Sequence, residues 1–252
     1  MHRFFCPVSN SAGDKIIIGD KDQAHHIKNV LRLKEGEKAI VFDEKGNEYN
    51  CIISGIGNKI YLDVKGKISS GQKMAKIKLT VACAMPKKAR MDDIVDKLVQ
   101  LGVNRIIPLK TERTIVKLDK PKEASRLIRW RKIALSASKQ SQRNDLAIIE
   151  PVNSFEEAIA LSAEFDLKLV PHLLGARKSL KVILDKFFRK IEPPPFIPKI
   201  LVLIGPEGDF SAREVQLAID SGFIPITLGD LVLRVDTASL AVASCIELYA
   251  QN

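Results

Sequence analysis

The sequence lacks paired cysteines. Its four cysteines are widely separated, lie among apolar neighbours and form no C-x-x-C pair: Cys6, Cys51, Cys83 and Cys245. Structural zinc sites and disulfide-rich folds usually show close or regular cysteine spacing. We therefore predict reduced thiols in the protein core, no disulfide and no metal site.

A long apolar run is also missing. No segment approaches the roughly 20 consecutive apolar residues that span a bilayer. The opening stretch Met1-His-Arg-Phe-Phe does not contain the apolar centre of a signal peptide. We expect a cytoplasmic protein of one or two domains with no membrane partner.

Three common enzyme motifs are absent from the sequence. There is no G-x-G-x-x-G after an expected strand, no G-x-x-x-x-G-K-[ST] and no G-x-S-x-G. Their absence argues against a Rossmann-type dinucleotide site, a P-loop and an α/β-hydrolase nucleophile. Acidic residues are outnumbered, because 40 Lys and Arg stand against 30 Asp and Glu and give a formal net charge of +10. Such a charge favours a polyanionic partner, above all nucleic acid.

Residues 1–70 have the pattern of a small β-rich module. Short apolar or alternating runs at 15–18, 39–42, 49–53 and 59–64 are separated by glycine turns. One segment, 22–32, has helical spacing and should bury Ile27, Val30 and Leu31 on one face. The polar stretch 69–73 then marks a boundary.

Residues 74–252 form the expected second domain, in which strands alternate with helices. Apolar runs predict strands at 77–84, 105–109, 166–173 and 200–204, and helical periodicity predicts helices at 87–102, around Trp130 and at 179–190. Capping boxes at Ser154 and Ser211 begin two more helices. This alternation is typical of an α/β domain with a mainly parallel sheet covered on both faces.

Two glycine turns near the C-terminus are the best candidates for a ligand site. The aliphatic run 200–204 leads into Gly205-Pro-Glu-Gly208, and a second apolar run leads into Leu228-Gly229 and then Leu233-Arg234. A helix is expected directly after each turn. Glycine turns before helices expose backbone amides at the positive end of the helix dipole, where polar ligand groups bind.

In order and approximate spacing, these two turns resemble the signatures of the SPOUT RNA methyltransferases, and within them the RsmE family. The resemblance covers nearly the whole chain. It implies a SPOUT α/β domain with a trefoil knot, an N-terminal PUA-like β-barrel and a homodimer that packs through the C-terminal helix at 238–250. It further implies transfer of a methyl group from S-adenosyl-L-methionine to N3 of a uridine in small-subunit ribosomal RNA or in the assembled small subunit.

The resemblance also assigns candidate residues. Those expected to bind the cofactor are Leu203, Gly205, Pro206, Glu207, Gly208, Leu228, Gly229, Leu233, Thr237 and Ala238. Those expected to bind RNA are Arg3, His25, His26, Lys28, Arg32, Lys88, Arg90, Arg113, Arg131, Lys139, Gln140 and Arg143. Each cation in the second set has an ordinary alternative as a solvated helix end or surface charge.

The chemistry needs a group that stabilises negative charge. Uridine N3 must lose its proton, and the resulting charge spreads to O2 and O4, where a fixed cation would lower the barrier. Arg234 is the candidate for this role. As an alternative, Arg234 pairs with Glu207 or Asp236 and only holds the turns together. Either carboxylate is a candidate for the general base.

The sequence departs from the family pattern at four positions. Asp209 replaces a third glycine, Leu231 an arginine, and Asp236 and Gln100 each a glutamate. Two other functions stay open at this point: a non-catalytic ribosome-assembly or RNA-binding factor, and a SPOUT enzyme that modifies another nucleotide or a ribose hydroxyl.

Overall fold

The computed structural model describes residues 1–7, 10–43, 46–68, 76–86, 90–114, 119–143, 145–173, 175–190 and 196–251. By their internal contacts they group into two compact units. The first contains residues 1–73 together with 138–146, and the second contains 74–137 together with 147–252. Each unit has its own sheet.

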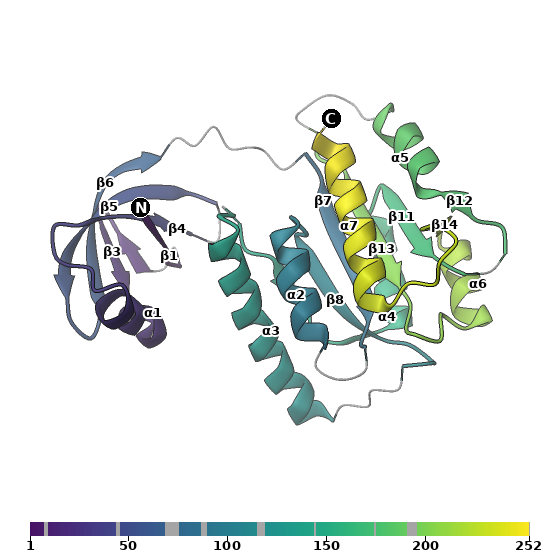
Figure 1. The fold of residues 1–252 in the computed structure, drawn as a ribbon, viewed down its shortest axis with the longest axis horizontal. Coiled ribbons are helices and arrows are strands. Elements are labelled where there is room, and N and C mark those ends of the chain that lie inside the picture. Colours follow the sequence, from purple (N-terminus) through teal and green to yellow (C-terminus); the bar gives the residue numbers. More distant parts are fainter. Residues whose placement is uncertain are drawn as a thin grey trace. The chain divides into compact units, whose positions relative to one another are not determined.

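The first unit is built on a six-stranded sheet in the order β1-β4-β5-β6-β3-β2. Only the β1–β4 pair is parallel. Register shifts at Asn50/Cys51 and Ile53/Gly55 interrupt the β5–β6 ladder, and such bulges bend a sheet, which here curls into a half-barrel (Figure 1). The strands are β1 (His2–Phe5), β2 (Ser11–Ala12), β3 (Lys15–Ile18), β4 (Lys38–Phe42), β5 (Glu48–Ile56) and β6 (Ile60–Ile68).

The helical segment of this unit differs from the prediction in its register. It begins as α1 (Lys21–His25) and continues as a π-helical turn, η2 (His26–Val30). Ile27 is fully buried as predicted, but Val30 is 59% exposed, so its predicted burial was wrong. A π-turn has more residues per turn than the 3.6 of an α-helix and rotates Val30 away from the core.

The second unit contains an eight-stranded sheet whose pairs are all parallel. Its order is β10-β8-β7-β13-β11-β14-β12, and β9 pairs with β8. The predicted α/β class is confirmed. The strands are β7 (Lys78–Ala84), β8 (Arg105–Lys110), β9 (Ile148–Ile149), β10 (Asn153–Ser154), β11 (Leu167–Pro171), β12 (Lys178–Ser179), β13 (Lys199–Ile204) and β14 (Ile224–Thr227).

Helices cover both faces of this sheet. Ile200, Val202 and Ile204 of β13 pack in the larger core with α2, α3, α5 and α7, whereas Leu201 and Leu203 pack in a second core with α4 and α6. Figure 1 shows α2 and α7 side by side across the sheet. The bounds are α2 (Arg90–Gln100), α3 (Lys120–Gln140), α4 (Phe155–Ala160), η3 (Leu161–Glu164), α5 (Leu180–Phe188), α6 (Ala212–Asp220) and α7 (Val235–Gln251).

Predictions from short sequence patterns are confirmed in this unit. Both predicted capping boxes form, at Ser154–Glu157 on α4 and at Ser211–Glu214 on α6. Trp130 is only 1% exposed and donates to Asp92, which confirms it as a core residue of α3.

The cysteine prediction holds for three positions and fails for one. Cys6, Cys51 and Cys83 are buried free thiols, and burial raises the pKa of Cys83 to about 12. Cys245 is exposed on α7, so its predicted core position was wrong. Within the part of the chain that the structure describes, no cluster of His, Cys, Asp and Glu could hold a metal ion, and no helix is long and apolar enough to cross a membrane.

Candidate functional site

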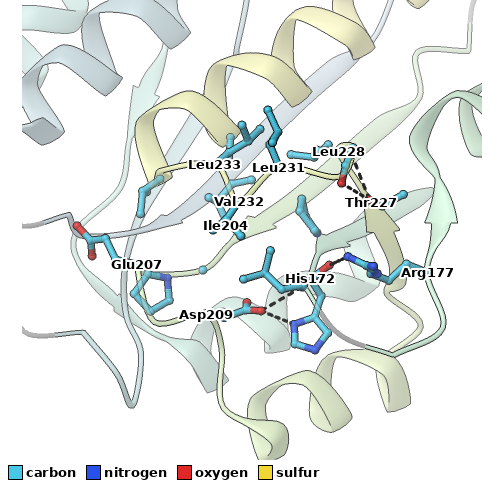
Figure 2. Close-up of a pocket in the computed structure, with 17 residues that line it drawn as sticks. His172, Arg177, Ile204, Glu207, Asp209, Thr227, Leu228, Leu231, Val232 and Leu233 are labelled. Atoms are coloured by element: carbon cyan, nitrogen blue, oxygen red, sulfur yellow. Dashed lines mark hydrogen bonds and ion pairs between the residues drawn. The ribbon is translucent and has the colours of Figure 1, made fainter.

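A pocket lies where three neighbouring strands end. The adjacent strands β13, β11 and β14 are parallel, and Leu169 pairs with both Val202 and Ile224. Their carboxyl ends therefore meet at one edge, which is the usual ligand position in open α/β sheets. The cavity measures about 570 Å³, a volume that includes its solvent-open part (Figure 2).

Three chain segments and one helix line this pocket. They are the segment after β11, residues 205–210 (called the first turn below), residues 228–234 (the second turn) and the start of α7. The lining residues are Pro171, His172, Leu173, Arg177, Ile204, Gly205, Pro206, Glu207, Asp209, Thr227, Leu228, Gly229, Leu231, Val232, Leu233, Val235 and Ala238.

The first turn is tightly packed around Gly205. A Cβ atom at Gly205 would lie 3.1 Å from the Phe210 ring and 3.2 Å from the Asp209 carboxylate, closer than ordinary contacts. Phe210 is buried and packs against Phe155, with the ring centroids 5.2 Å apart. A side chain at position 205 would therefore require Phe210 and Asp209 to shift.

The loop after β8 braces the same turn. Arg113 donates to the carbonyl oxygens of Gly208 at 2.7 Å and Phe210 at 3.3 Å. The buried Glu214 carboxylate accepts from the backbone amides of Glu112 at 2.9 Å and Ser211 at 2.8 Å. These bonds join β8 to the start of α6 across about a hundred residues of sequence.

Asp209 occupies a backbone conformation that usually favours glycine. Its φ is +59°, in the left-handed region that Asp and Asn tolerate better than other side chains. This explains how aspartate can replace the family's third glycine without distorting the turn. The substitution brings a carboxylate into the pocket wall, where it accepts from the amides of Phe210 at 2.8 Å and Leu173 at 3.1 Å.

The second turn has few contacts and is largely exposed. Thr227 bonds the backbone of Gly229 twice, at 3.0 and 3.2 Å. Gly229 has a φ of +120°, which a residue with a Cβ rarely adopts, and its own surroundings are open. Leu231 and Val232 are 80% and 73% exposed.

Most predicted cofactor residues meet at this pocket. Those that line it are Gly205, Pro206, Glu207, Leu228, Gly229, Leu233 and Ala238. Leu203, Gly208 and Thr237 are not among the lining residues, and the Leu203 side chain packs in the core on the opposite face of the sheet. Sequence reasoning missed the segment after β11, with His172 and Arg177, because only the sheet order places this segment beside the two turns.

The three candidate catalytic residues lie at or near the turns. Arg234 is exposed just before α7. Asp236 lies in the first turn of α7 and accepts from the Thr237 amide at 3.0 Å. Glu207 is exposed, and Figure 2 shows its carboxylate directed away from His172 and Asp209.

In the first unit, the candidate RNA-binding residues differ in how exposed their side chains are. The side chains of His25, His26, Lys28, Arg32 and Gln140 are exposed. Arg3 and Arg143 instead hold the unit together, with side chains 12% and 9% exposed. Arg3 pairs with Glu48, lies over the Phe42 ring and donates to the Arg143 carbonyl, while Arg143 pairs with Asp145 at 2.9 Å.

Partial burial lowers the pKa of Lys139, and the Asp20 carboxylate opposes this effect.

The remaining candidate cations belong to the second unit. Arg90 is half-buried at the start of α2, and Arg131 donates to the Ile149 carbonyl at 3.3 and 3.4 Å. Arg113 holds the first turn as described above. Lys88 lies outside the described residues.

The sequence matches two known domain families. Residues 73–247 match the family described as RNA methyltransferase domain, and residues 18–65 match the RNA methyltransferase PUA domain. Because the first match spans more than half of the protein, the chain belongs to this RNA methyltransferase family. The predicted resemblance is confirmed.

Individual relatives are similar to this protein over almost the whole chain. The chain is 28% identical over 230 residues to ribosomal RNA small subunit methyltransferase E of Bacillus subtilis, covering 91% of this chain and 89% of that protein. It is 30% identical over 221 residues to the Synechocystis protein of the same name, covering 86% and 67%. A crystal structure of the Neisseria gonorrhoeae methyltransferase E bound to S-adenosyl methionine superposes with a TM-score of 0.81 at 28% identity, covering 98% and 97%.

Proposed function

We propose that this protein transfers a methyl group from S-adenosylmethionine to N3 of a uridine in small-subunit ribosomal RNA. The observation that carries the proposal is the pocket formed by the two turns at the carboxyl edge of an RNA methyltransferase domain. The names of the relatives and the ligand of the Neisseria structure support it. The net charge of +10 suits an RNA substrate.

The chemistry of the lining residues fits the proposed cofactor. Leu228, Leu231, Val232 and Leu233 offer an apolar wall for a flat adenine ring, and the His172 and Arg177 side chains offer polar partners for a charged amino-acid end. When bound, S-adenosylmethionine supplies an electrophilic methyl group on a sulfonium sulfur.

Arg234 is proposed to stabilise the uracil ring as N3 loses its proton. Its guanidinium is exposed beside the pocket and stays charged at any working pH. Donation to O2 or O4 would favour the negative charge that develops there. Asp236 and Glu207 are the two carboxylates proposed for accepting the N3 proton, and the single variants Asp236→Asn and Glu207→Gln distinguish them.

RNA binding is proposed to rest on exposed cations. In the first unit these are His25, His26, Lys28 and Arg32 along α1 and the turn after it. Arg3 and Arg143 act indirectly in this proposal, since their guanidinium groups support the strands and the segment after α3. Single-stranded RNA and phosphate contacts suit such a surface, because both depend on positive charge.

Three finer expectations complete the proposal. The family resemblance favours a trefoil-knotted path through the two turns, a homodimer and action in the cytoplasm. On α7, Leu248 is 62% exposed and Cys245 is also exposed, which provides apolar surface for packing against a second copy.

The function is tested by mapping modified nucleosides in small-subunit RNA from cells with and without the protein. We expect one 3-methyluridine to disappear without it, and purified protein with S-adenosylmethionine to restore the mark on small subunits. Loss of a different modification would indicate another target nucleotide. An unchanged modification map, together with no methyl transfer in vitro, would favour a non-catalytic assembly factor.

A further inference from the structure

Asp209 stands at the junction of two pocket walls. One wall is the first turn, to which Asp209 belongs, and the other is the segment after β11 that carries His172 and Leu173. A glycine would satisfy the backbone conformation at this position, with its φ of +59°. The carboxylate is therefore an addition that the turn geometry alone does not need.

Both carboxylate oxygens of Asp209 are used. Oδ1 accepts from the Phe210 amide at 2.8 Å, which fixes the first turn, and Oδ2 accepts from the Leu173 amide at 3.1 Å, which ties the opposite wall to it. A carboxylate only accepts hydrogen bonds and has two oxygens, so it can serve two N–H donors at once.

The His172 ring adds a third contact to the same carboxylate. Its Nδ1 atom lies 2.8 Å from Asp209 Oδ2 (Figure 2). The two side chains form an ion pair when the ring carries a proton. The two side chains are only 14% and 15% exposed, which screens the contact less than an open surface pair would be screened.

We propose that Asp209 is a positioning residue that holds the segment after β11 against the first turn and so keeps the cofactor pocket in its binding shape. This inference rests on the proposed binding of S-adenosylmethionine. A pocket that is already ordered loses less entropy when its ligand binds, so loss of the carboxylate should lower affinity without removing any contact to the reacting methyl group.

Two variants distinguish the effect of the carboxylate from the effect of the backbone conformation at position 209. Asp209→Gly keeps the favoured φ and removes every side-chain bond. Asp209→Asn keeps one acceptor oxygen for Phe210 but places an amide donor opposite the Leu173 N–H. The matched control is Asp166→Asn, because Asp166 also accepts a backbone amide, from Lys199 at 2.8 Å, at the other end of the β11–β13 strand pair.

Three measurements test whether Asp209 holds the segment after β11 against the first turn. Hydrogen exchange at the Leu173 amide should become at least about tenfold faster in both Asp209 variants without cofactor, while the amides within β11 and β13 stay protected. Calorimetry should show an affinity for S-adenosylmethionine about tenfold lower. In methyl transfer, KM for S-adenosylmethionine should rise by a similar factor, with kcat unchanged within about twofold. Asp166→Asn should leave all three values unchanged.

The inference is overturned if Leu173 exchange and cofactor affinity stay within twofold of wild type in both variants. It is also overturned if exchange accelerates throughout the sheet, because the role of Asp209 is then general stability. Failure of the proposed function would give a different result. The wild-type protein would then not bind S-adenosylmethionine, while Leu173 exchange would still be faster in the Asp209 variants.

Discussion

The two turns that line the pocket are held in opposite ways. The first turn is fastened by Arg113, by the buried Glu214 and by the bonds of Asp209, and it buries Phe210. The second turn is held mainly by Thr227, and it exposes Leu231 and Val232. The first turn is thus set by the protein itself, whereas the second leaves apolar surface open to a ligand or another chain.

The largest expected effect is on catalysis and belongs to the second turn. Arg234→Ala should lower the single-turnover methylation rate by about 10²–10³, as the loss of one charge-stabilising donor does elsewhere. Affinity for S-adenosylmethionine should change less than about threefold, which is under about 0.7 kcal/mol. Arg234→Lys keeps the charge without the planar fork and should recover only part of the rate. Parallel loss of affinity and folding stability would instead show that Arg234 holds the turn.

The next largest effect should come from overfilling the first turn. Gly205→Val puts side-chain atoms against the Phe210 ring, where even a Cβ would lie at 3.1 Å. Such overpacking should lower the unfolding free energy by about 1–3 kcal/mol, and distortion of the wall should abolish measurable cofactor binding. Urea denaturation and calorimetry measure the two effects.

Gly229→Val provides the comparison for Gly205→Val in the second turn. Its surroundings are open, so it acts through backbone strain alone. The exposed turn can relax, and we expect weaker binding with a smaller loss of stability. Equal destabilisation by both substitutions would mean that the second turn is as tightly held as the first.

Substitution of Glu214 measures how much its buried carboxylate contributes to the unfolding free energy. It is 2% exposed and bonds the amides of Glu112 and Ser211. Glu214→Gln retains one acceptor oxygen and should lower the unfolding free energy by about 1–2 kcal/mol. The matched control is Glu157→Gln, because Glu157 forms the same capping box on α4 from an exposed position and without the second bond. The two variants should differ by at least about 0.5 kcal/mol, and equal losses would contradict a bracing role.

Local patterns predicted much of this site. The aliphatic run of β13 and the Ser211–Glu214 capping box lie within a few residues of each other, so the end of the strand and the start of α6 could be inferred directly. Family resemblance then identified both turns, and seven of the proposed cofactor residues line one pocket.

Long-range contacts could not be predicted in the same way. His172 reaches the pocket only because β11 lies between β13 and β14, an order that no local pattern contains. Arg113 was assigned to RNA, but its guanidinium bonds carbonyls about a hundred residues away in sequence. Val30 was misplaced because a π-turn looks like an ordinary helix in an apolar pattern.

The smallest effect should come from the exposed tip of the second turn. Leu231 is 80% exposed, so Leu231→Ser should leave the unfolding free energy of dilute protein unchanged within about 0.5 kcal/mol. Phe210→Leu in the first turn removes volume from a 2% exposed site and should lower the unfolding free energy by at least about 1 kcal/mol. Denaturation at two protein concentrations measures both variants. A loss above about 1 kcal/mol for Leu231→Ser that grows with concentration would show that a second copy of the chain covers this turn.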